Sequence, residues 1–261
     1  MRTSRKKLKT RGANGARRKK STPNGWIYGH HAVVAALRNP NRIIRQLLAT
    51  TNAAEKLQDC AGETAITITN REEIELHTEP GAVHQGVAAD VEPLPRAEIE
   101  DVIAAAKDKK QVTVLALDQA TDPRNVGAVL RSAAAFGVAA LIQQDRHAPP
   151  ITGAMTKAAS GGLEHVTMLN VTNFARALNQ LKDADFWIVG LDGAADHELG
   201  KLDMPDKCCL VLGAESSGLR RLTREACDLA VKIPINEDIG SLNLSNAAAV
   251  ALYEINRRRR G

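Results

Sequence analysis

The sequence predicts an α/β protein with a small N-terminal unit and a larger C-terminal unit that contains a parallel sheet. From residue 112 onward, apolar runs without polar alternation are separated by helical stretches, a pattern typical of strands covered by helices on both faces. A shorter α/β pattern comes first, and the two prolines of Glu92-Pro93-Leu94-Pro95 separate the two patterns. The 261 residues, 44% hydrophobic and 25% charged, are typical of a globular protein, and no apolar run approaches the roughly 18 residues of a membrane span.

The N-terminal unit is predicted from short elements. Trp26 to Leu37 indicates a strand or turn followed by an amphipathic helix, which Asn39-Pro40 closes. The further expected elements are strands at 43–50, 65–69 and 86–91 and a helix at 53–60.

The C-terminal unit is predicted from a more regular alternation, which a helix from residue 97 to about 107 precedes. The expected strands are 112–117, 138–142, 166–169, 186–191, 208–212 and 229–233. The expected helices are 126–136, 151–159, 173–181, 219–225 and 243–258. Ligands of an open parallel sheet bind where its strands end, so the loops after the apolar strands are the candidate sites.

The charge is unevenly distributed along the chain. The formal net charge is +5, but residues 1–20 contain ten Lys or Arg and no acidic residue, and Arg257 to Arg260 add four more. Between these two basic ends the chain has 21 basic and 30 acidic residues, so this part has a net charge of −9. Basic runs of this kind are typically solvated, disordered arms that contact nucleic-acid phosphates, although a tail that only aids solubility is an alternative. The aromatic content of 3% argues against a base-stacking surface.

The cysteines and histidines favour neither a disulfide framework nor a metal site. The four cysteines form no C-x-x-C pair, which fits a reducing cytoplasm, and the N-terminal stretch lacks the apolar core of a secretory signal. The seven histidines show no metal-ligand spacing. No G-x-G-x-x-G is present, so a Rossmann dinucleotide site is not supported.

The first unusual loop starts at Asp118 and runs into an Ala-rich helix. Asp122-Pro123 is explained equally well as an N-cap with a first-turn proline. Arg131 is a candidate functional residue, because an unpaired guanidinium within an apolar helix would be costly. Asn125 and Arg131 are six residues apart, or about 120° around an ideal helix. If both line one pocket, Asn125 must therefore lie in the turn before the helix.

The second loop follows the apolar run that ends at Leu212. Gly213 and Gly218 have the spacing of a P-loop, but Leu219-Arg220 replaces its Lys and Ser or Thr, which argues against a nucleotide triphosphate site. The two glycines still permit close backbone approach to a ligand, and Glu215 between them is a candidate site residue. The alternative is a helix-capping turn with a surface glutamate.

The third loop is Ser241-Leu242-Asn243-Leu244-Ser245-Asn246, directly before the Ala-rich last helix. Ser241 or Asn243 could simply cap that helix. However, polar side chains at 241, 243 and 245 exceed what one cap needs, and Ser241 and Ser245 would share a helical face.

In this order, the three loops resemble those of the SpoU/TrmH family of RNA ribose 2′-O-methyltransferases in the SPOUT superfamily, over about residues 110 to 258. The resemblance implies an α/β domain with a deep trefoil knot that holds S-adenosylmethionine, and it implies a homodimer. No metal ion is expected, because the sequence has no metal-ligand cluster. Knots are nearly absent from other folds, so this expectation rests on the resemblance alone.

The resemblance also implies roles for single residues. The backbone around Gly213, Ile233 and Leu242 would hold the cofactor. The residues expected to line the reaction pocket are Asn125, Arg131, Glu215, Ser241, Asn243 and Ser245. Arg131 corresponds to the residue proposed in the family to activate the hydroxyl. A guanidinium stays protonated, so Arg131 is a poor base. We therefore favour a role in which it binds the phosphate and stabilises the developing alkoxide. Glu215 and Asn243 would orient the ribose, and relatives often carry a glycine within Ser216-Ser217.

The N-terminal unit, with Tyr28 to Val33 and His84 to Val87, resembles the ribosomal-protein-like substrate domain of bacterial 23S ribosomal RNA guanosine 2′-O-methyltransferases. The expected domains are a basic arm at 1–24, an RNA substrate-binding domain at 25–92, a linker at 93–110 and a methyltransferase domain at 111–261. The expected partner is 23S ribosomal RNA or the assembling large subunit in the cytoplasm, with no membrane. The alternatives are tRNA as substrate and a non-catalytic RNA-binding factor for ribosome assembly.

Overall fold

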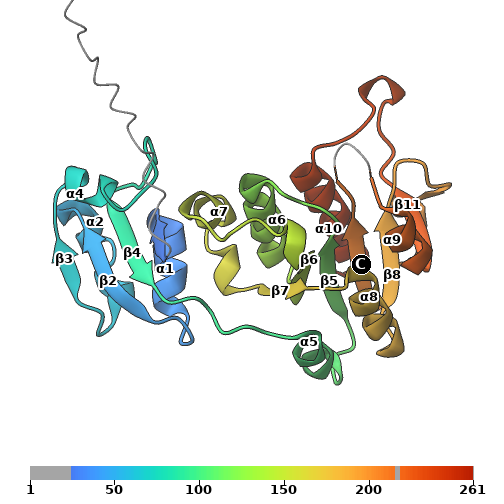
Figure 1. Ribbon diagram of the computed structural model, residues 1–261, viewed down its shortest axis with the longest axis horizontal. Helices are drawn as coiled ribbons and strands as arrows, with labels where there is room; N and C mark the ends of the chain where they lie inside the picture. The colour runs from blue at the N-terminus through green and yellow to red at the C-terminus, as the bar shows by residue number, and fades with distance from the viewer. Residues whose placement is uncertain (1–24, 215–217, 261) are drawn as a thin grey trace, which may run out of the picture.

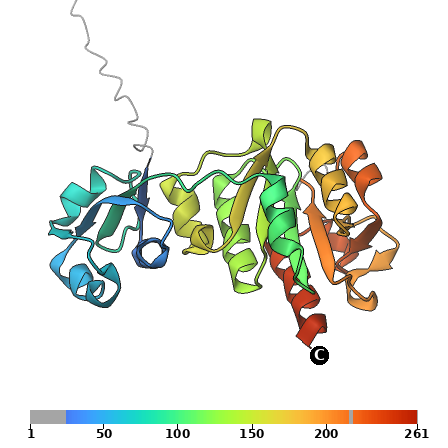
Figure 2. The ribbon, with the colours of Figure 1, turned by 90° about the horizontal axis from the view of Figure 1, so that it is seen from below.

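A computed structural model describes residues 25–214 and 218–260, and the expected basic arm lies outside them. The described part contains two β-sheets at opposite ends of the long axis, joined by an extended segment after residue 91 (Figures 1 and 2). The N-terminal sheet has four strands and the C-terminal sheet has seven. The predicted α/β class, with a smaller unit preceding a larger parallel sheet, is confirmed.

The N-terminal sheet mixes antiparallel and parallel pairs. Strand β1 (Trp26–Tyr28) and strand β2 (Ile44–Ala49) both pair antiparallel with β4 (Val87–Val91), and β2 pairs parallel with β3 (Ile66–Ile68). The helices of this unit are α1 (His30–Arg38), α2 (Thr51–Glu55), α3 (Gln58–Ala61) and α4 (Arg71–Glu75).

Two features of this unit differ from the sequence analysis. The single helix expected at 53–60 is two short helices, α2 and α3, with Lys56 and Leu57 between them. Helix α4 was not predicted. It buries only Ile74, so the sequence lacks the repeated apolar positions of an amphipathic helix, and its start is fixed by the Asn70 side chain, which accepts a hydrogen bond from the backbone N–H of Glu73.

The C-terminal sheet is parallel throughout. Its strands are β5 (Val112–Leu117), β6 (Ala140–Gln144), β7 (Thr167–Val171), β8 (Trp187–Leu191), β9 (His197–Glu198), β10 (Lys207–Leu212) and β11 (Leu229–Lys232). Their spatial order is β7-β6-β5-β10-β8-β11-β9, so β10 lies between β5 and β8. This order places strands that are far apart in the sequence next to each other. The trefoil knot implied by the family resemblance stays a prediction.

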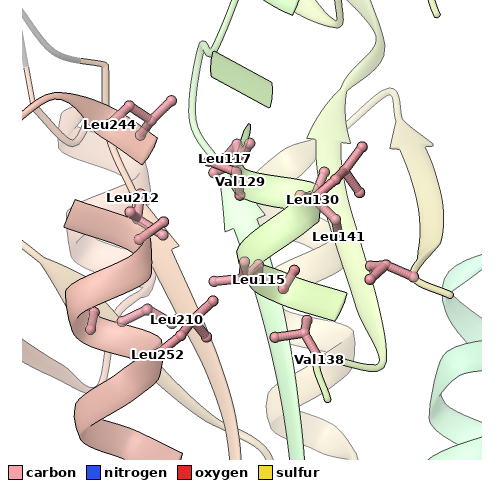
Figure 3. Close-up of a cluster of buried hydrophobic side chains, with 14 of the residues drawn as sticks. Leu115, Leu117, Val129, Leu130, Val138, Leu141, Leu210, Leu212, Leu244 and Leu252 are labelled. Carbon is pink, nitrogen blue, oxygen red and sulfur yellow. The ribbon is translucent and has the colours of Figure 1, made fainter. Parts of the chain in front are cut away.

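Helices cover both faces of this sheet, as predicted. They are α5 (Ile99–Ala106), α6 (Pro123–Ala135), α7 (Gly153–Ala159), α8 (Phe174–Asp183), α9 (Arg221–Ala226) and α10 (Leu244–Arg260). Leu115 and Leu117 of β5 point into one buried cluster with α6, α7 and α10, whereas Val114 and Ala116 point into a second cluster with α5, α8 and α9. Figure 3 shows the first cluster, in which Leu130 and Leu252 pack over β5 and β10.

The C-terminal arginines lie within α10, close to the end of the helix expected at 243–258. Arg257 and Arg258 donate to the Glu254 carboxylate one helical turn earlier, at 2.8 and 2.7 Å. These hydrogen bonds lower the pKa of Glu254 to about 2. Arg259 donates to the Thr113 hydroxyl at 2.6 Å and to the carbonyls of Pro205 and Asp206. Arg257 and Arg258 lie three and four residues after Glu254, the spacings at which side chains of a helix meet, whereas Arg259 is held by residues of other elements.

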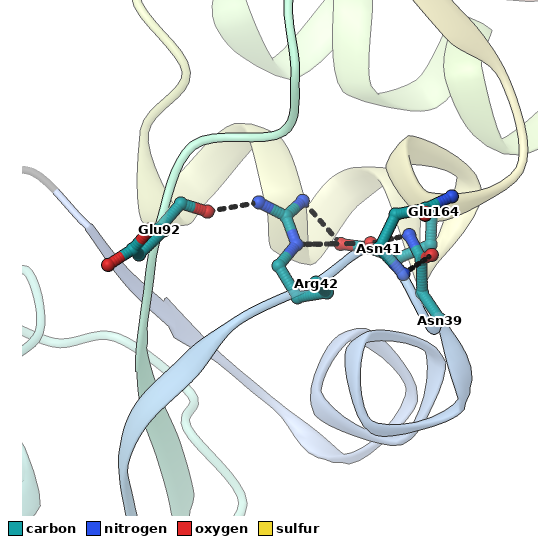
Figure 4. Close-up of polar contacts among 5 residues, drawn as sticks. All are labelled: Asn39, Asn41, Arg42, Glu92 and Glu164. Atoms are coloured by element: carbon teal, nitrogen blue, oxygen red, sulfur yellow. Dashed lines mark hydrogen bonds and ion pairs between the residues drawn. The ribbon is translucent and has the colours of Figure 1, made fainter.

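The two sheet units are joined by a buried ion pair (Figure 4). Arg42, between α1 and β2, contacts Glu164 of the short 3-10 turn Gly162–Glu164 with Nη2 2.6 Å from Oε1. Both side chains are only 3% exposed. Arg42 also donates to the Glu92 carbonyl at 2.7 Å, and the Asn39 amide donates to Glu164 at 2.7 Å. The N-terminal unit is therefore held against the C-terminal unit by specific polar contacts.

The two N-terminal motifs meet at this same junction. The Gly29 N–H donates to the Val87 carbonyl, and the His30 N–H donates to the Gln85 side chain at 3.1 Å. From α7, Lys157 donates to the Val83 carbonyl. Gly153 lies so close to the Tyr28 ring that a Cβ would come within 2.3 Å of Cε1, so only glycine permits this approach. Burial raises the pKa of Tyr28 to about 12.

Candidate active site

The three loops singled out in the sequence start at one edge of the C-terminal sheet. Leu117 of β5 and Leu191 of β8 both stand in register with Leu212 of β10, and Val231 of β11 stands in register with Leu191. Because the strands are parallel, the loops that follow β5, β10 and β11 leave from the same side. This carboxyl edge is where open α/β sheets bind ligands.

The first loop leads into α6 through an ordinary helix cap. The Asp122 side chain accepts from the Arg124 N–H at 2.9 Å, and Pro123 occupies the first helical position. The structural explanation for Asp122-Pro123 is therefore confirmed. Asn125 lies in the first turn of α6. A pocket shared with Arg131 required Asn125 to lie in the turn before the helix, and the structure does not place it there.

Asn125 is joined directly to the third loop. The Asn243 amide donates to the Asn125 side-chain oxygen at 3.2 Å. The Asn243 side-chain oxygen in turn accepts from the Ser245 N–H at 2.9 Å and from the Ser245 hydroxyl at 2.6 Å. Asn243 therefore caps α10 and also bridges to α6. Three predicted site residues form one hydrogen-bonded set of neutral amide and hydroxyl groups, which suits recognition of sugar hydroxyls.

The second loop closes on itself. Ala214 and Gly218 form an isolated antiparallel bridge, with the Gly218 N–H donating to the Ala214 carbonyl at 2.9 Å. A Cβ on Gly213 would lie 2.2 Å from the Gly218 oxygen, and Gly218 has a positive φ of 64°. Both glycines are therefore required by the loop itself. The predicted site residue Glu215 and the pair Ser216-Ser217 lie outside the described residues.

The other residues predicted in the third loop are less closely joined. Ser241 is exposed and precedes α10, which starts at Leu244. Ser241 and Ser245 therefore do not share a helical face, and that expectation is wrong. Ile233, just after β11, and Leu242 are both half-buried, and Ile233 packs against the cluster under α6 and α10.

Arg131 differs most from its sequence interpretation. It is exposed on α6 and forms no ion pair with any described residue, so the argument from a costly buried guanidinium does not hold. The Ala-rich sequence suggested burial, but the buried face of α6 is formed by other residues: Val126, Gly127, Val129, Leu130 and Ala133. With Asn125 inside the same helix, the two side chains leave it about 120° apart.

Sequence reasoning missed Asp118 as a part of the site. Its side chain has no exposed surface, and it accepts hydrogen bonds from Arg220 and Thr223. The available signal was an acidic residue placed directly after six buried strand residues, where an unpaired charge would be costly. Its partners lie 102 and 105 residues later, and no local pattern points to them.

Two surface hollows, of about 800 and 1160 Å³, lie elsewhere, beside α5 and along the segment that joins the two sheets. Within residues 25–214 and 218–260, no group of three His, Cys, Asp or Glu could hold a metal ion. No described helix is both long and apolar enough to cross a membrane. The candidate site is thus defined by polar contacts at the sheet edge.

Comparison with known proteins covers both units. The SpoU rRNA Methylase family matches residues 112–253, and the RNA 2'-O ribose methyltransferase substrate binding domain matches residues 26–97. The chain is 39% identical over 239 residues to the 23S rRNA (guanosine-2'-O-)-methyltransferase RlmB of Yersinia pestis, an alignment that covers 89% of this chain and 97% of the relative. It is 41% identical to RlmB of Photorhabdus laumondii, with 89% and 98% covered.

The fold is also that of a solved relative. The SpoU methyltransferase AviRb from Streptomyces viridochromogenes, in complex with AdoMet, superposes with a TM-score of 0.75 at 23% identity, covering 90% of each chain. Family and fold agree along nearly the whole described chain. The protein therefore belongs to the SpoU rRNA methylase family and carries the family's RNA substrate-binding domain ahead of the methylase domain.

Proposed function

We propose that this protein transfers the methyl group of S-adenosylmethionine to the ribose 2′-hydroxyl of a guanosine in 23S ribosomal RNA. The observation that carries the proposal is the hydrogen-bonded set Asn125, Asn243 and Ser245 at the carboxyl edge of the sheet, in a chain that belongs to this family. The relatives that are named for this reaction align over 89% of the chain, a length that spans both sheets. The identity of 39% and 41% to these relatives favours 23S ribosomal RNA over tRNA as the substrate.

The residues at the sheet edge fit S-adenosylmethionine. Strand β8 lies between β10 and β11, so the backbones that follow Leu212 and Val231 flank its end, about 10 Å apart by strand spacing. Ile233 and Leu242 offer half-buried apolar surface beside polar backbone, a mixture suited to an adenosine group. We assign cofactor binding to the backbone of Gly213, Ile233 and Leu242. When bound, the cofactor supplies a methyl group activated by a positively charged sulfur.

The polar side chains would position the ribose for the reaction. Methyl transfer to oxygen is a direct displacement, so most of the acceleration comes from holding the 2′-hydroxyl in line with the methyl group. We assign this positioning to Asn243 and Glu215, with Asn125, Ser241 and Ser245 completing the pocket. Arg131 leaves α6 on a different side from Asn125, so it would bind the neighbouring phosphate and stabilise the developing alkoxide through its charge and not by lining the same pocket wall.

The N-terminal sheet would bind the RNA outside the reaction pocket. We propose residues 25–92 as the substrate-binding domain, 93–110 as the linker and 111–261 as the methyltransferase domain; the matched family domains lie close to these limits. The basic residues of 1–24 would add phosphate contacts. We propose a cytoplasmic location, which is supported by ribosomal RNA as the substrate and by the four free thiols, a state typical of a reducing compartment.

Two measurements test the proposed reaction. Calorimetry with S-adenosylmethionine in the presence of EDTA should give a binding heat, and the protein should methylate a 23S ribosomal RNA transcript but not tRNA. Asn243→Ser keeps a helix-capping side chain but loses the amide that bonds to Asn125, so methyl transfer should fall about tenfold or more. Asn246→Ala, at an exposed position in the first turn of α10, should retain full activity.

Three outcomes would contradict the proposal. Absence of a binding heat, or binding that needs a divalent ion, would exclude the assigned cofactor site. Tight RNA binding without methyl transfer would favour an assembly factor. Methylation of tRNA in place of 23S ribosomal RNA would change the substrate. Mapping ribose methylation in a strain that lacks the protein would then identify the nucleotide.

We further propose that the protein acts as a homodimer, in which a second copy covers the outer side of α10. Val250 and Tyr253 are 44% and 56% exposed, and the Tyr253 ring meets the Phe136 ring edge-on at 6.3 Å. A solvent-exposed aromatic group next to exposed aliphatic surface is typical of an interface. Tyr253→Glu should shift the mass measured by light scattering from dimer to monomer, whereas Trp187→Glu, also at an exposed position, should not. A monomeric unaltered chain would refute the assignment.

A further inference from the structure

A buried carboxylate connects the first loop to the second. The Asp118 side chain has no exposed surface, and its Oδ1 lies 2.6 Å from Nη2 and 2.7 Å from Nε of Arg220. Its Oδ2 accepts from the Thr223 hydroxyl at 2.7 Å and from the Arg220 backbone N–H at 3.2 Å. The carboxylate thus receives three hydrogen bonds and a further ion-pair contact with Nη2 of the Arg220 guanidinium, and its burial is compensated.

These contacts hold both ends of the second loop. At the start of the loop, the Asp118 N–H donates to the Leu212 carbonyl at 2.8 Å. At its end, the Asp118 carboxylate binds Arg220, which follows the buried residue Leu219. One residue of the first loop therefore fixes the entry and the exit of the segment from Gly213 to Leu219. The tight closure of Gly213 on Gly218 lies between these two attachment points.

The pair differs from an ion pair formed by α9, the helix that Arg220 precedes. Arg224 of α9 also contacts an aspartate that follows a strand, Asp192 after β8, with Nη2 2.6 Å from Oδ2. There the arginine is 56% exposed, and the aspartate retains 13% exposure. Among the described residues, the side chain of Arg224 forms its ion pair with Asp192 and not with the second loop. This pair therefore serves as a matched control for charge and distance.

We propose that Asp118 and Arg220 are positioning residues, which hold the two described ends of the second loop, at Gly213 and at Leu219, where the backbone binds S-adenosylmethionine. The inference rests on the proposed function, because that function assigns the backbone of Gly213 to the cofactor. Neither side chain needs to touch the cofactor. Their effect passes through the loop ends, so its loss should weaken cofactor binding and leave RNA binding unchanged.

Four variants of the full chain test this role. Arg220→Gln leaves the Asp118 carboxylate buried without its cation, and the dissociation constant for S-adenosylmethionine, measured by calorimetry, should rise about tenfold or more. Arg220→Lys keeps the charge but loses the contact through both Nε and Nη2, so its affinity for S-adenosylmethionine should lie between those of the unaltered chain and Arg220→Gln. The double variant Asp118→Asn with Arg220→Gln removes both charges and should bind no worse than Arg220→Gln alone. Arg224→Gln should bind as the unaltered chain does.

Two further readouts separate positioning from general stabilisation. Amide hydrogen exchange of the peptide that covers 210–220 should accelerate in Arg220→Gln without cofactor, while peptides of β6 and α8 stay protected. The KM for S-adenosylmethionine should rise while the KM for RNA stays constant. The double variant, which buries no unpaired charge, keeps the test valid if Arg220→Gln folds poorly.

The possible failures are distinguishable. If the unaltered chain does not bind S-adenosylmethionine, the proposed function fails and the cofactor part of this inference fails with it. If the unaltered chain binds S-adenosylmethionine, and both Arg220→Gln and the double variant bind it as tightly as the unaltered chain does, only the inference is overturned. A lower melting temperature with unchanged affinity for S-adenosylmethionine and unchanged amide exchange at 210–220 would likewise show that the pair only stabilises the fold.

Discussion

Arg131→Ala should lower the rate of methyl transfer at least about 100-fold while cofactor affinity stays nearly constant, because removal of a charge stabiliser acts on the transition state. Arg131 is exposed on α6 and forms no ion pair with a described residue, so its charge is available to a phosphate. It leaves the helix about 120° away from Asn125, on a different side from the amide and hydroxyl set. The expected effect is therefore on kcat and on the KM for RNA.

Two variants define the role of the Arg131 charge. Arg131→Lys keeps a point charge without the planar fork and should recover part of the rate. Arg176→Ala removes another exposed arginine, from α8 on the opposite face of the sheet, and should leave the rate unchanged. Near-normal turnover of Arg131→Ala on 23S ribosomal RNA would show that Arg131 has no part in the reaction. An equal loss in Arg176→Ala would indicate only a general effect of positive charge.

The parallel sheet was predictable because its strands are continuous apolar runs. Residues 112–117 were expected as a strand and form β5 with the same bounds, since every one of them is buried. Elements with few buried residues were not predictable. Helix α4 buries only Ile74, and β9 has two residues, so neither produces a periodic pattern. The number of residues that an element buries therefore decides whether its sequence reveals it.

The candidate site was predictable only in part. The ends of the parallel strands pointed to the loops, the family resemblance placed Asn125, Asn243 and Ser245 in one pocket, and the structure joins these three by hydrogen bonds. The Asp118–Arg220 contact joins residues 102 positions apart, and no local pattern encodes such a pair. The position of Arg131 was misjudged because alanine fits both buried and exposed helix faces, so an Ala-rich helix does not reveal which side is covered.

The buried pair between the two units should give the largest effect on stability. Glu164→Ala leaves the Arg42 guanidinium, which is 3% exposed, without the carboxylate that it contacts through Nε and Nη2. Loss of one partner of a buried ion pair typically lowers the free energy of unfolding by about 3 to 5 kcal/mol. Because Arg42 belongs to the N-terminal unit and Glu164 to the C-terminal one, we expect the docking of the two sheets to weaken first.

The two tryptophans of the chain report on the two units separately. Trp26 lies in β1 and Trp187 in β8, so in a Trp187→Phe background urea unfolding followed by fluorescence reports the N-terminal sheet alone. Glu164→Ala should move this transition to lower urea.

Arg42→Met with Glu164→Leu replaces both charges by apolar groups and should restore most of the loss. Arg45→Ala breaks an exposed pair with Glu92 in the N-terminal unit and should change stability by at most about 1 kcal/mol. If Glu164→Ala unfolds at the same urea concentration as the unaltered chain, the Arg42–Glu164 contact does not hold the two units together. The arrangement of the RNA-binding sheet relative to the reaction pocket must then depend on the contacts of α7 with β1.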